Sequence, residues 1–146
     1  MSEALDTLYA APIREHARRP RHRSGLECAD ATARGDNPLC GDRVELFLKL
    51  DGTRIAEASF LGRGCDVSQA SADLLAEAVR GLDAADARAL SARVRAMARS
   101  GEGADALGAL GALAAAARFP SRVKCATLPW VTLEAALDGA REASSE

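Results

Sequence analysis

Cysteine is the residue type in this sequence best suited to metal binding or nucleophilic chemistry. The chain contains four cysteines, at Cys28, Cys40, Cys65 and Cys125. Three of them, Cys40, Cys65 and Cys125, fall at predicted boundaries between secondary-structure elements. A thiol at a helix N-terminus has a lowered pKa, and its thiolate is both a nucleophile and a metal ligand. The spacing is too wide for a zinc finger, which pairs cysteines within about two to four residues. Any site that these thiols form must therefore be assembled by the fold.

Asp42 adds a carboxylate beside the first of these thiols. In Cys40-Gly41-Asp42 the two side chains lie two residues apart on a predicted loop, and Gly41 permits a tight backbone. Three thiolates and one carboxylate supply four ligands, a set that suits zinc or an iron–sulfur cluster better than magnesium or calcium. The candidate electrostatic supports are the basic residues close to the thiols in sequence: Arg63, Arg122 and Lys124.

Hydrophobic periodicity predicts the elements that must position these residues. Apolar residues recur at helical spacing near the N-terminus, and a basic connector follows from Arg18 to Arg23. The clearest strand alternates apolar and polar residues up to Asp51-Gly52, a favoured hairpin turn. The predicted segments of this half are a helix at 4–18, a weak strand at 26–34, a turn at 35–38, and strands at 43–50 and 54–61.

The second half of the chain is predicted to be helical. Its predicted segments are helices at 67–80, 83–99 and 104–117, an extended stretch at 121–126, and a last helix that Thr127 caps and that ends near Gly139. The polar tail from Ala140 is expected to fray. This order predicts an α+β fold, in which a small antiparallel sheet of about three strands packs against several helices. The length of 146 residues predicts a single domain over 1–146.

Composition excludes several classes of function. The chain has 19 basic and 21 acidic residues, and this balance gives no electrostatic footprint for nucleic acid or for an anionic membrane. No apolar run reaches the length of about 18 residues that a membrane span needs. The first residues lack the basic start and apolar core of a signal peptide, so a cytoplasmic location is expected. In that compartment, thiols more often bind metals or react than form disulfides.

Three motifs occur in series along the chain. Residues 37–42 read NPLCGD, residues 62–65 read GRGC, and residues 122–128 read RVKCATL. The second is followed by Ser68, Ala70 and Ser71, and an N-terminal pattern precedes all three: Leu8-Tyr9, His16, Pro20-Arg21 and Gly25. In this order, over nearly the whole chain, the sequence resembles the SufU/IscU (NifU N-terminal) family of iron–sulfur cluster assembly proteins.

Within that family, the chain is most similar to the SufU branch. IscU-type members carry His before the third cysteine, where this chain has Lys124, and they have a shorter segment than the 59 residues between Cys65 and Cys125. The predicted helix at 83–99 fits the longer SufU-type segment. The resemblance implies a zinc-containing protein whose Cys40 accepts persulfide sulfur from a pyridoxal-phosphate-dependent, SufS-like cysteine desulfurase and passes it to a downstream assembly scaffold. The zinc ligands that it implies are Cys40, Asp42, Cys65 and Cys125.

Two other interpretations of the same ligands remain open. One is a scaffold on which a [2Fe–2S] cluster is assembled and then transferred. The other is a non-catalytic zinc module whose metal only stabilises the fold. Whether the chain is an enzyme, in the sense of a sulfurtransferase, depends on which interpretation holds.

Three further residues carry expectations of their own. Asp66 follows Cys65 where the family usually has a small or apolar residue, and it could pair with Arg63, cap the following helix or compete as a ligand. Cys28 matches no motif and is expected to be a small buried hydrophobic residue. His16 is expected to cap or pack the first helix rather than to bind metal.

Overall fold

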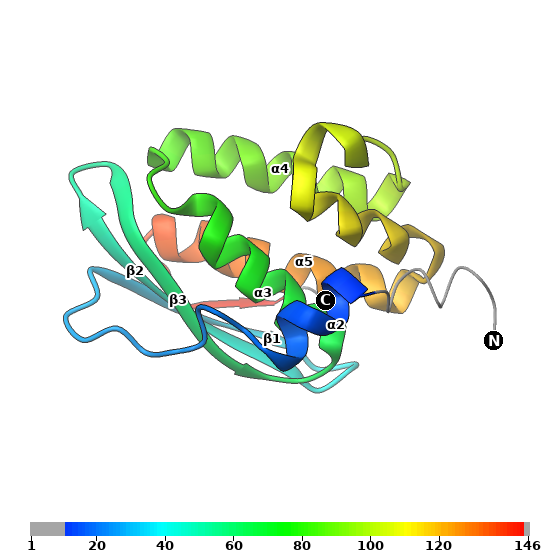
Figure 1. The fold of residues 1–146 in the computed structure, drawn as a ribbon. Helices are drawn as coiled ribbons and strands as arrows, with labels where there is room; N and C mark the ends of the chain where they lie inside the picture. Colours follow the sequence, from blue (N-terminus) through cyan, green and yellow to red (C-terminus); the bar gives the residue numbers. More distant parts are fainter. Residues whose placement is uncertain (1–10, 145–146) are drawn as a thin grey trace.

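The computed structural model describes residues 11–144 and places four strands, four α-helices and one 3₁₀-helix in that range (Figure 1). Residues 4–10 of the helix expected at 4–18 lie outside the described residues. The elements in chain order are α2 (Ala11–Arg18), β1 (Ala31–Asn37), β2 (Asp42–Asp51), β3 (Arg54–Arg63), α3 (Asp66–Val79), α4 (Ala84–Ser100), the 3₁₀-helix η1 (Ala104–Arg118), α5 (Pro120–Leu137) and β4 (Glu142–Ser144).

The strands form one sheet in the order β3-β2-β1-β4. β1 and β3 both pair antiparallel with β2, as the sequence predicts, whereas β4 pairs parallel with β1. The expected tail that frays from Ala140 thus contains a strand instead. The exposed edge of β1 explains this difference, because it offers backbone groups that need partners. The N–H of Arg34 donates to the carbonyl of Arg141 at 2.8 Å.

β1 lies later in the chain than the weak strand expected at 26–34, and it runs through most of the turn expected at 35–38. Its last residues stay extended because each has a partner on β2: Gly35 pairs with Val44, and Asn37 pairs with Asp42. The connection between the two strands is therefore only the four residues 38–41. Gly41 has φ +70°, a conformation that glycine adopts without steric cost.

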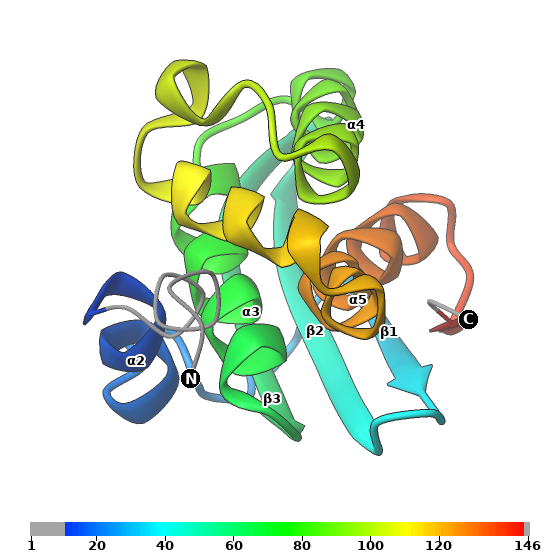
Figure 2. The ribbon, with the colours of Figure 1, turned by 90° about the vertical axis from the view of Figure 1, so that its right-hand side faces the viewer.

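Helices cover one face of the sheet in two layers (Figure 2). α3 and α5 contact the strands, while α4 and η1 contact each other and α5 from outside, and α2 packs against α3. The side chains of Leu46, Phe60, Leu75 and Trp130 are fully buried in this core. The Trp130 indole N–H donates to Ser71 Oγ at 3.1 Å, which satisfies its polar atom. Within residues 11–144, none of the helices has the length and apolar character needed to cross a membrane.

The expected helix at 104–117 is present but wound as a 3₁₀-helix. Glycine accounts for an irregular path here, since Gly108 has φ 56° and ψ −128°, outside the helical region. A Cβ on Gly111 would come within 2.5 Å of the Ala104 carbonyl oxygen. The alanine content raised the helix propensity of this segment, and the glycines break the regular α-helical geometry.

The last helix begins at Pro120, so the expectation of an extended stretch at 121–126 followed by a helix capped at Thr127 was wrong. Proline is well suited to the first turn of a helix, because its missing N–H would have no partner there. Thr127 instead donates its hydroxyl to the carbonyl of Val123 at 2.9 Å, inside the helix. Cys125 therefore lies within α5 rather than before it.

Gly35 is a point of very close approach between β1 and α5. A Cβ there would overlap the hydroxyl of Thr132 and lie 3.0 Å from Leu128 Cδ1. We expect Gly35→Ala to lower the free energy of unfolding by about 1–3 kcal/mol in urea denaturation, because the core must shift to admit the methyl group. Gly25→Ala is the matched control: its Cβ would meet only Leu61 Cδ1, at 3.9 Å, and should change stability by less than about 0.5 kcal/mol. Equal effects would contradict the close packing.

Candidate metal centre

Three of the four predicted ligands converge at one end of the sheet. Cys40 lies in the turn between β1 and β2, Asp42 begins β2, and Cys125 lies near the start of α5. One ligand atom from each of these side chains lies within 4.8 Å of the other two. Residues far apart in the sequence thus form a group that is placed to hold a metal ion.

The short turn between β1 and β2 aims Cys40 and Asp42 at the same point. Its two ends are joined by the pairing of Asn37 with Asp42, and the Cys40 N–H donates to the Asn37 carbonyl at 3.2 Å. Asp42 is only 2% exposed, on the face of the sheet that the helices cover. Side chains alternate along a strand, so the next residue, Arg43, points to solvent.

Cys65 lies beside this group, although its sulfur is not among the three atoms that meet. It is the N-cap residue of α3 and is half-buried, and its backbone N–H donates to Asp42 Oδ1 at 2.9 Å. Gly64 has φ +137°, and a Cβ on it would overlap the Asp42 carboxylate, so only glycine fits between the two residues. The carboxylate therefore ties the N-terminus of α3 to the start of β2.

The thiols of Cys65 and Cys125 lie close enough to shift each other's pKa in opposite directions. The neighbouring Cys125 thiol is the main cause that lowers the pKa of Cys65 to about 6. Burial opposes that shift, and N–H groups in the first turn of α3 support it. The neighbouring Cys65, followed by burial and the Asp42 carboxylate, raises the pKa of Cys125. The Cys125 thiol itself donates to the Ser121 carbonyl at 3.5 Å. At neutral pH, Cys65 is therefore the thiolate of the pair and Cys125 the thiol.

Asn37 is a residue of the site to which the sequence assigned no role. It is fully buried, and its Nδ2 donates to Asp42 Oδ2 at 3.3 Å and to Cys125 Sγ at 3.6 Å. The sequence places it at the start of the first motif, directly before a proline. Asparagine in that position is also typical of an ordinary turn, so the pattern alone gave no separate signal for a site residue.

Comparison with known proteins places this arrangement in a family. Residues 8–126 match the model of the NifU-like N-terminal domain. The chain belongs to this family. It is 40% identical over 132 residues to the zinc-dependent sulfurtransferase SufU of Bacillus subtilis (strain 168), with 89% of each protein covered. It is 36% identical over 135 residues to the iron–sulfur cluster assembly scaffold protein IscU of Streptococcus pyogenes serotype M1, covering 91% of this chain and 84% of that protein.

Solved structures have the same fold as this NifU-like domain. One is an iron–sulfur cluster assembly scaffold protein for the SUF system from Fervidobacterium islandicum AW-1, with a TM-score of 0.78 and 31% identity over 90% of this chain and 98% of that one. Another, a NifU-like N-terminal domain from Brucella abortus, has a TM-score of 0.84 at 21% identity and shows the fold alone. The family resemblance expected from the three motifs is confirmed.

The basic residues expected to support the site lie in two places. Arg63 pairs across the strands with Arg43 and is exposed on the face of the sheet opposite to Asp42. Arg122 and Lys124 are half-buried in the first turns of α5, close in sequence to the cluster. Their electrostatic support of the thiols stays a prediction.

Asp66, the departure from the family pattern, is the first residue of α3. A negative charge in the first turn of a helix is favourable, because the unpaired N–H groups there carry partial positive charge. The group of residues placed to hold a metal does not include it. Its position therefore favours a charge interaction with the helix N-terminus over competition as a ligand. The N-cap residue itself is Cys65, and no side chain forms a capping bond there.

Two residues outside the site have clear positions. Cys28 is exposed in the connector before β1, so the expectation that it is buried was wrong. His16 meets the expectation of a packing role, since its Nδ1 lies 2.6 Å from Oδ2 of the buried Asp73. The other Asp73 oxygen accepts the backbone N–H groups of Arg21 and His22, both at 2.9 Å. This carboxylate therefore fixes α2 and the basic connector on α3.

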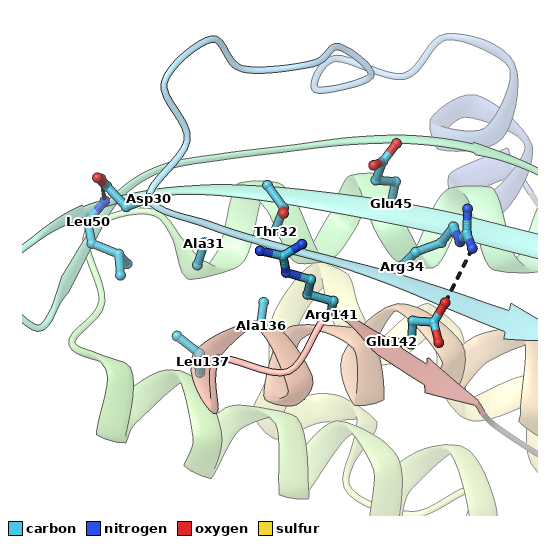
Figure 3. A pocket seen from close by; sticks show the side chains of 11 residues that line it. Asp30, Ala31, Thr32, Arg34, Glu45, Leu50, Ala136, Leu137, Arg141 and Glu142 are labelled. Atoms are coloured by element: carbon cyan, nitrogen blue, oxygen red, sulfur yellow. Dashed lines mark hydrogen bonds and ion pairs between the residues drawn. The ribbon is translucent and has the colours of Figure 1, made fainter.

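A separate groove of about 1050 Å³ runs between the edge of β1, β4 and the end of α5 (Figure 3). An ion pair between Arg34 and Glu142, at 3.3 Å, lies within it. None of the four candidate ligands lines this groove. The hollow is therefore distinct from the thiol cluster.

The thiols of the metal-free domain should react in a fixed order with iodoacetamide. Cys65 should stay reactive down to about pH 6 and then lose about tenfold in rate per pH unit, because the thiolate is the nucleophile and its pKa is lowered. Cys125 should react only on unfolding, since it is fully buried and its pKa is raised. Peptide mass spectrometry reads each site, with the exposed Cys28 as internal control. A Cys125 that reacts as fast as Cys65 in the folded protein would contradict this pairing.

Proposed function

We propose that this domain is a zinc-binding sulfur acceptor of iron–sulfur cluster assembly, which works in the cytoplasm with a cysteine desulfurase. The observation that carries the proposal is the meeting of Cys40, Asp42 and Cys125 within 4.8 Å, in a chain 40% identical to a zinc-dependent sulfurtransferase. Cys65 completes the proposed ligand set, because its backbone N–H donates to Asp42 and its thiol has Cys125 as the main influence on its pKa.

The donor set of the site fits zinc. Thiolates are soft ligands, and four donors match the tetrahedral coordination that zinc adopts in proteins. The site is also arranged for negative charge, since the N-terminus of α3 and the amide of Asn37 both direct N–H groups toward it. Bound zinc would keep the thiols deprotonated and would bring no redox chemistry of its own.

Cys40 is the best placed of the three thiols to receive sulfur. Cys125 is fully buried inside α5, and Cys65 is fixed at the first turn of α3. Cys40 lies in a four-residue turn and is half-buried, and its neighbours Leu39 and Gly41 are exposed. A partner protein can therefore reach Cys40 without disturbing a helix or a strand.

The proposed transfer is a simple exchange between sulfur atoms. The Cys40 thiolate attacks the outer sulfur of a persulfide on the desulfurase. A new S–S bond forms on Cys40, the S–S bond of the partner breaks, and the partner cysteine leaves as a thiolate. Two electrons of the attacking thiolate form the new bond, so no external oxidant or reductant is needed. The sulfur then passes to a downstream assembly scaffold.

A scaffold for a [2Fe–2S] cluster is the second candidate function. The 36% identity to an assembly scaffold protein of the IscU type supports it, and the same thiols could bind iron. We favour sulfur transfer because Lys124 stands where the resemblance places a histidine in IscU-type members. The α4 helix also occupies the longer segment between the second and third cysteines that is typical of SufU.

An anaerobic metal competition separates these two functions. We expect the purified protein to hold about one zinc per chain and to retain it in excess ferrous iron and sulfide, because the thiolates bind zinc tightly. Metal analysis and acid-labile sulfide give the result directly. Replacement of zinc by a stoichiometric cluster would support the scaffold, and a chain with neither zinc nor cluster would refute both.

Substitution of Asp42 separates a working site from a purely structural zinc module. We expect Asp42→Ala, and the isosteric Asp42→Asn, to lower sulfur loading of Cys40 by about tenfold or more while the domain stays folded. Mass spectrometry of the persulfide and circular dichroism provide the two measurements. Asp36→Ala, on the solvent face of the same hairpin, is the matched control. Loss of folding with full loading in the remaining folded fraction would favour the structural module.

A further inference from the structure

Asn37 contacts several of the proposed ligands, although nothing in the sequence indicates such a role. Its Nδ2 donates to a carboxylate oxygen of Asp42 and to the sulfur of Cys125, at 3.3 Å and 3.6 Å. Its backbone carbonyl accepts the N–H of Cys40 at 3.2 Å. The other Asp42 oxygen accepts the N–H of Cys65. One residue thus contacts three of the four proposed ligands directly and reaches the fourth through Asp42.

The amide of Asn37 is unusual because only half of it is satisfied. Its Oδ1 is buried, and no protein atom in the described residues donates to it. A buried acceptor without a partner is unfavourable, so packing alone would select a residue that lacks this oxygen. Serine is too short to reach both partners, and aspartate would place a second carboxylate against Asp42. Asparagine suits this position because its Nδ2 donates hydrogen bonds to both Asp42 and Cys125.

We propose that Asn37 is a positioning residue of the metal centre, which orients the Asp42 carboxylate and donates to the Cys125 sulfur while both serve as ligands. The inference rests on the proposed function, since it requires a metal at this site. It goes beyond that function because it assigns a role to a residue that offers no ligand itself. Groups that hydrogen-bond to metal ligands fix their orientation and tune how strongly they donate.

The charge of the site explains why such a donor is useful. Three thiolates and a carboxylate around a divalent cation leave excess negative charge in a buried place. A neutral N–H donor disperses part of that charge without competing for the metal or adding a proton that titrates. The amide of Asn37 also fixes the orientation of the Asp42 carboxylate. Its Nδ2 donates to Oδ2 of Asp42, while Oδ1 of the same carboxylate accepts the backbone N–H of Cys65.

Nuclear magnetic resonance of the unmodified 146-residue chain tests this assignment without a substitution. Asn37 is the only asparagine and Gln69 the only glutamine, so the side-chain amide region of the spectrum contains just two groups. On addition of zinc alone, we expect both Asn37 amide protons to shift and to exchange slowly with solvent. With a spin-active cadmium isotope in place of zinc, we expect the proton that donates to Cys125 to show coupling to the metal. Within the described residues, the side-chain amide of Gln69 donates only to Ser68 Oγ, at 3.5 Å, and contacts none of the proposed ligand atoms, so it is the internal reference.

A substitution gives the second, independent readout. We expect Asn37→Ala to bind zinc about 10- to 100-fold more weakly in competition with a chelator. In the cobalt-loaded protein, the sulfur-to-metal charge-transfer band should move to longer wavelength, because the sulfur loses a hydrogen-bond donor. Ser91→Ala is the matched control, since it also removes a buried hydrogen-bonding group but lies on α4. The control should change neither the affinity nor the band.

A double-mutant cycle tests whether Asn37 acts through Asp42. If it does, Asn37→Ala should weaken zinc binding less in an Asp42→Asn background than in the unmodified chain. Full additivity, together with an unshifted Asn37 amide on metal loading, would overturn the inference while leaving the proposed function intact. A chain that takes up neither zinc nor cadmium would overturn the proposed function itself.

Discussion

The carboxylate of Asp42 is the group on which the rest of the site depends, because it is almost completely removed from water. Burial of an ionised carboxylate costs several kcal/mol unless hydrogen bonds or a cation offset it. Two donors meet it here, the N–H of Cys65 and the amide of Asn37. These donors belong to the start of α3 and the end of β1. The bonds that make the buried charge tolerable therefore also bring the thiol-bearing elements together.

The position of the third thiol depends on how α5 lies against β1. Gly35 and Asn37 lie two residues apart on the same face of β1, and Thr132 and Cys125 lie about two helical turns apart on α5. Thr132 packs directly on Gly35, and Cys125 accepts from Asn37. The two contacts are successive steps along one helix–strand interface. Close packing at the first therefore sets the position of the sulfur at the second.

The sequence allowed prediction of those parts of the site that depend on local geometry. Cys40 and Asp42 share one short turn, so their convergence follows from a few residues. Cys125 was identified as a candidate although its helix was expected to start too late, since Pro120 and Thr127 are both plausible N-terminal residues. Asn37 could not be found in this way, because its partner Cys125 is 88 residues distant in the chain. The pairing of β4 with the edge of β1 could not be predicted either, because the two strands are far apart in the sequence.

The three thiols differ in what it would take to move them, and this difference supports the proposed role of Cys40. Displacement of Cys125 would disrupt the first turns of α5, and displacement of Cys65 would release the Asp42 carboxylate from the cap of α3. Cys40 is held within its turn by the hydrogen bond from its N–H to the Asn37 carbonyl, which contributes about 1 kcal/mol. The β1–β2 pairing on either side of the turn does not need to change when Cys40 moves. A site with one movable thiol and three fixed donors can expose a nucleophile and still keep its shape, which is what sulfur transfer requires and a purely structural metal site does not.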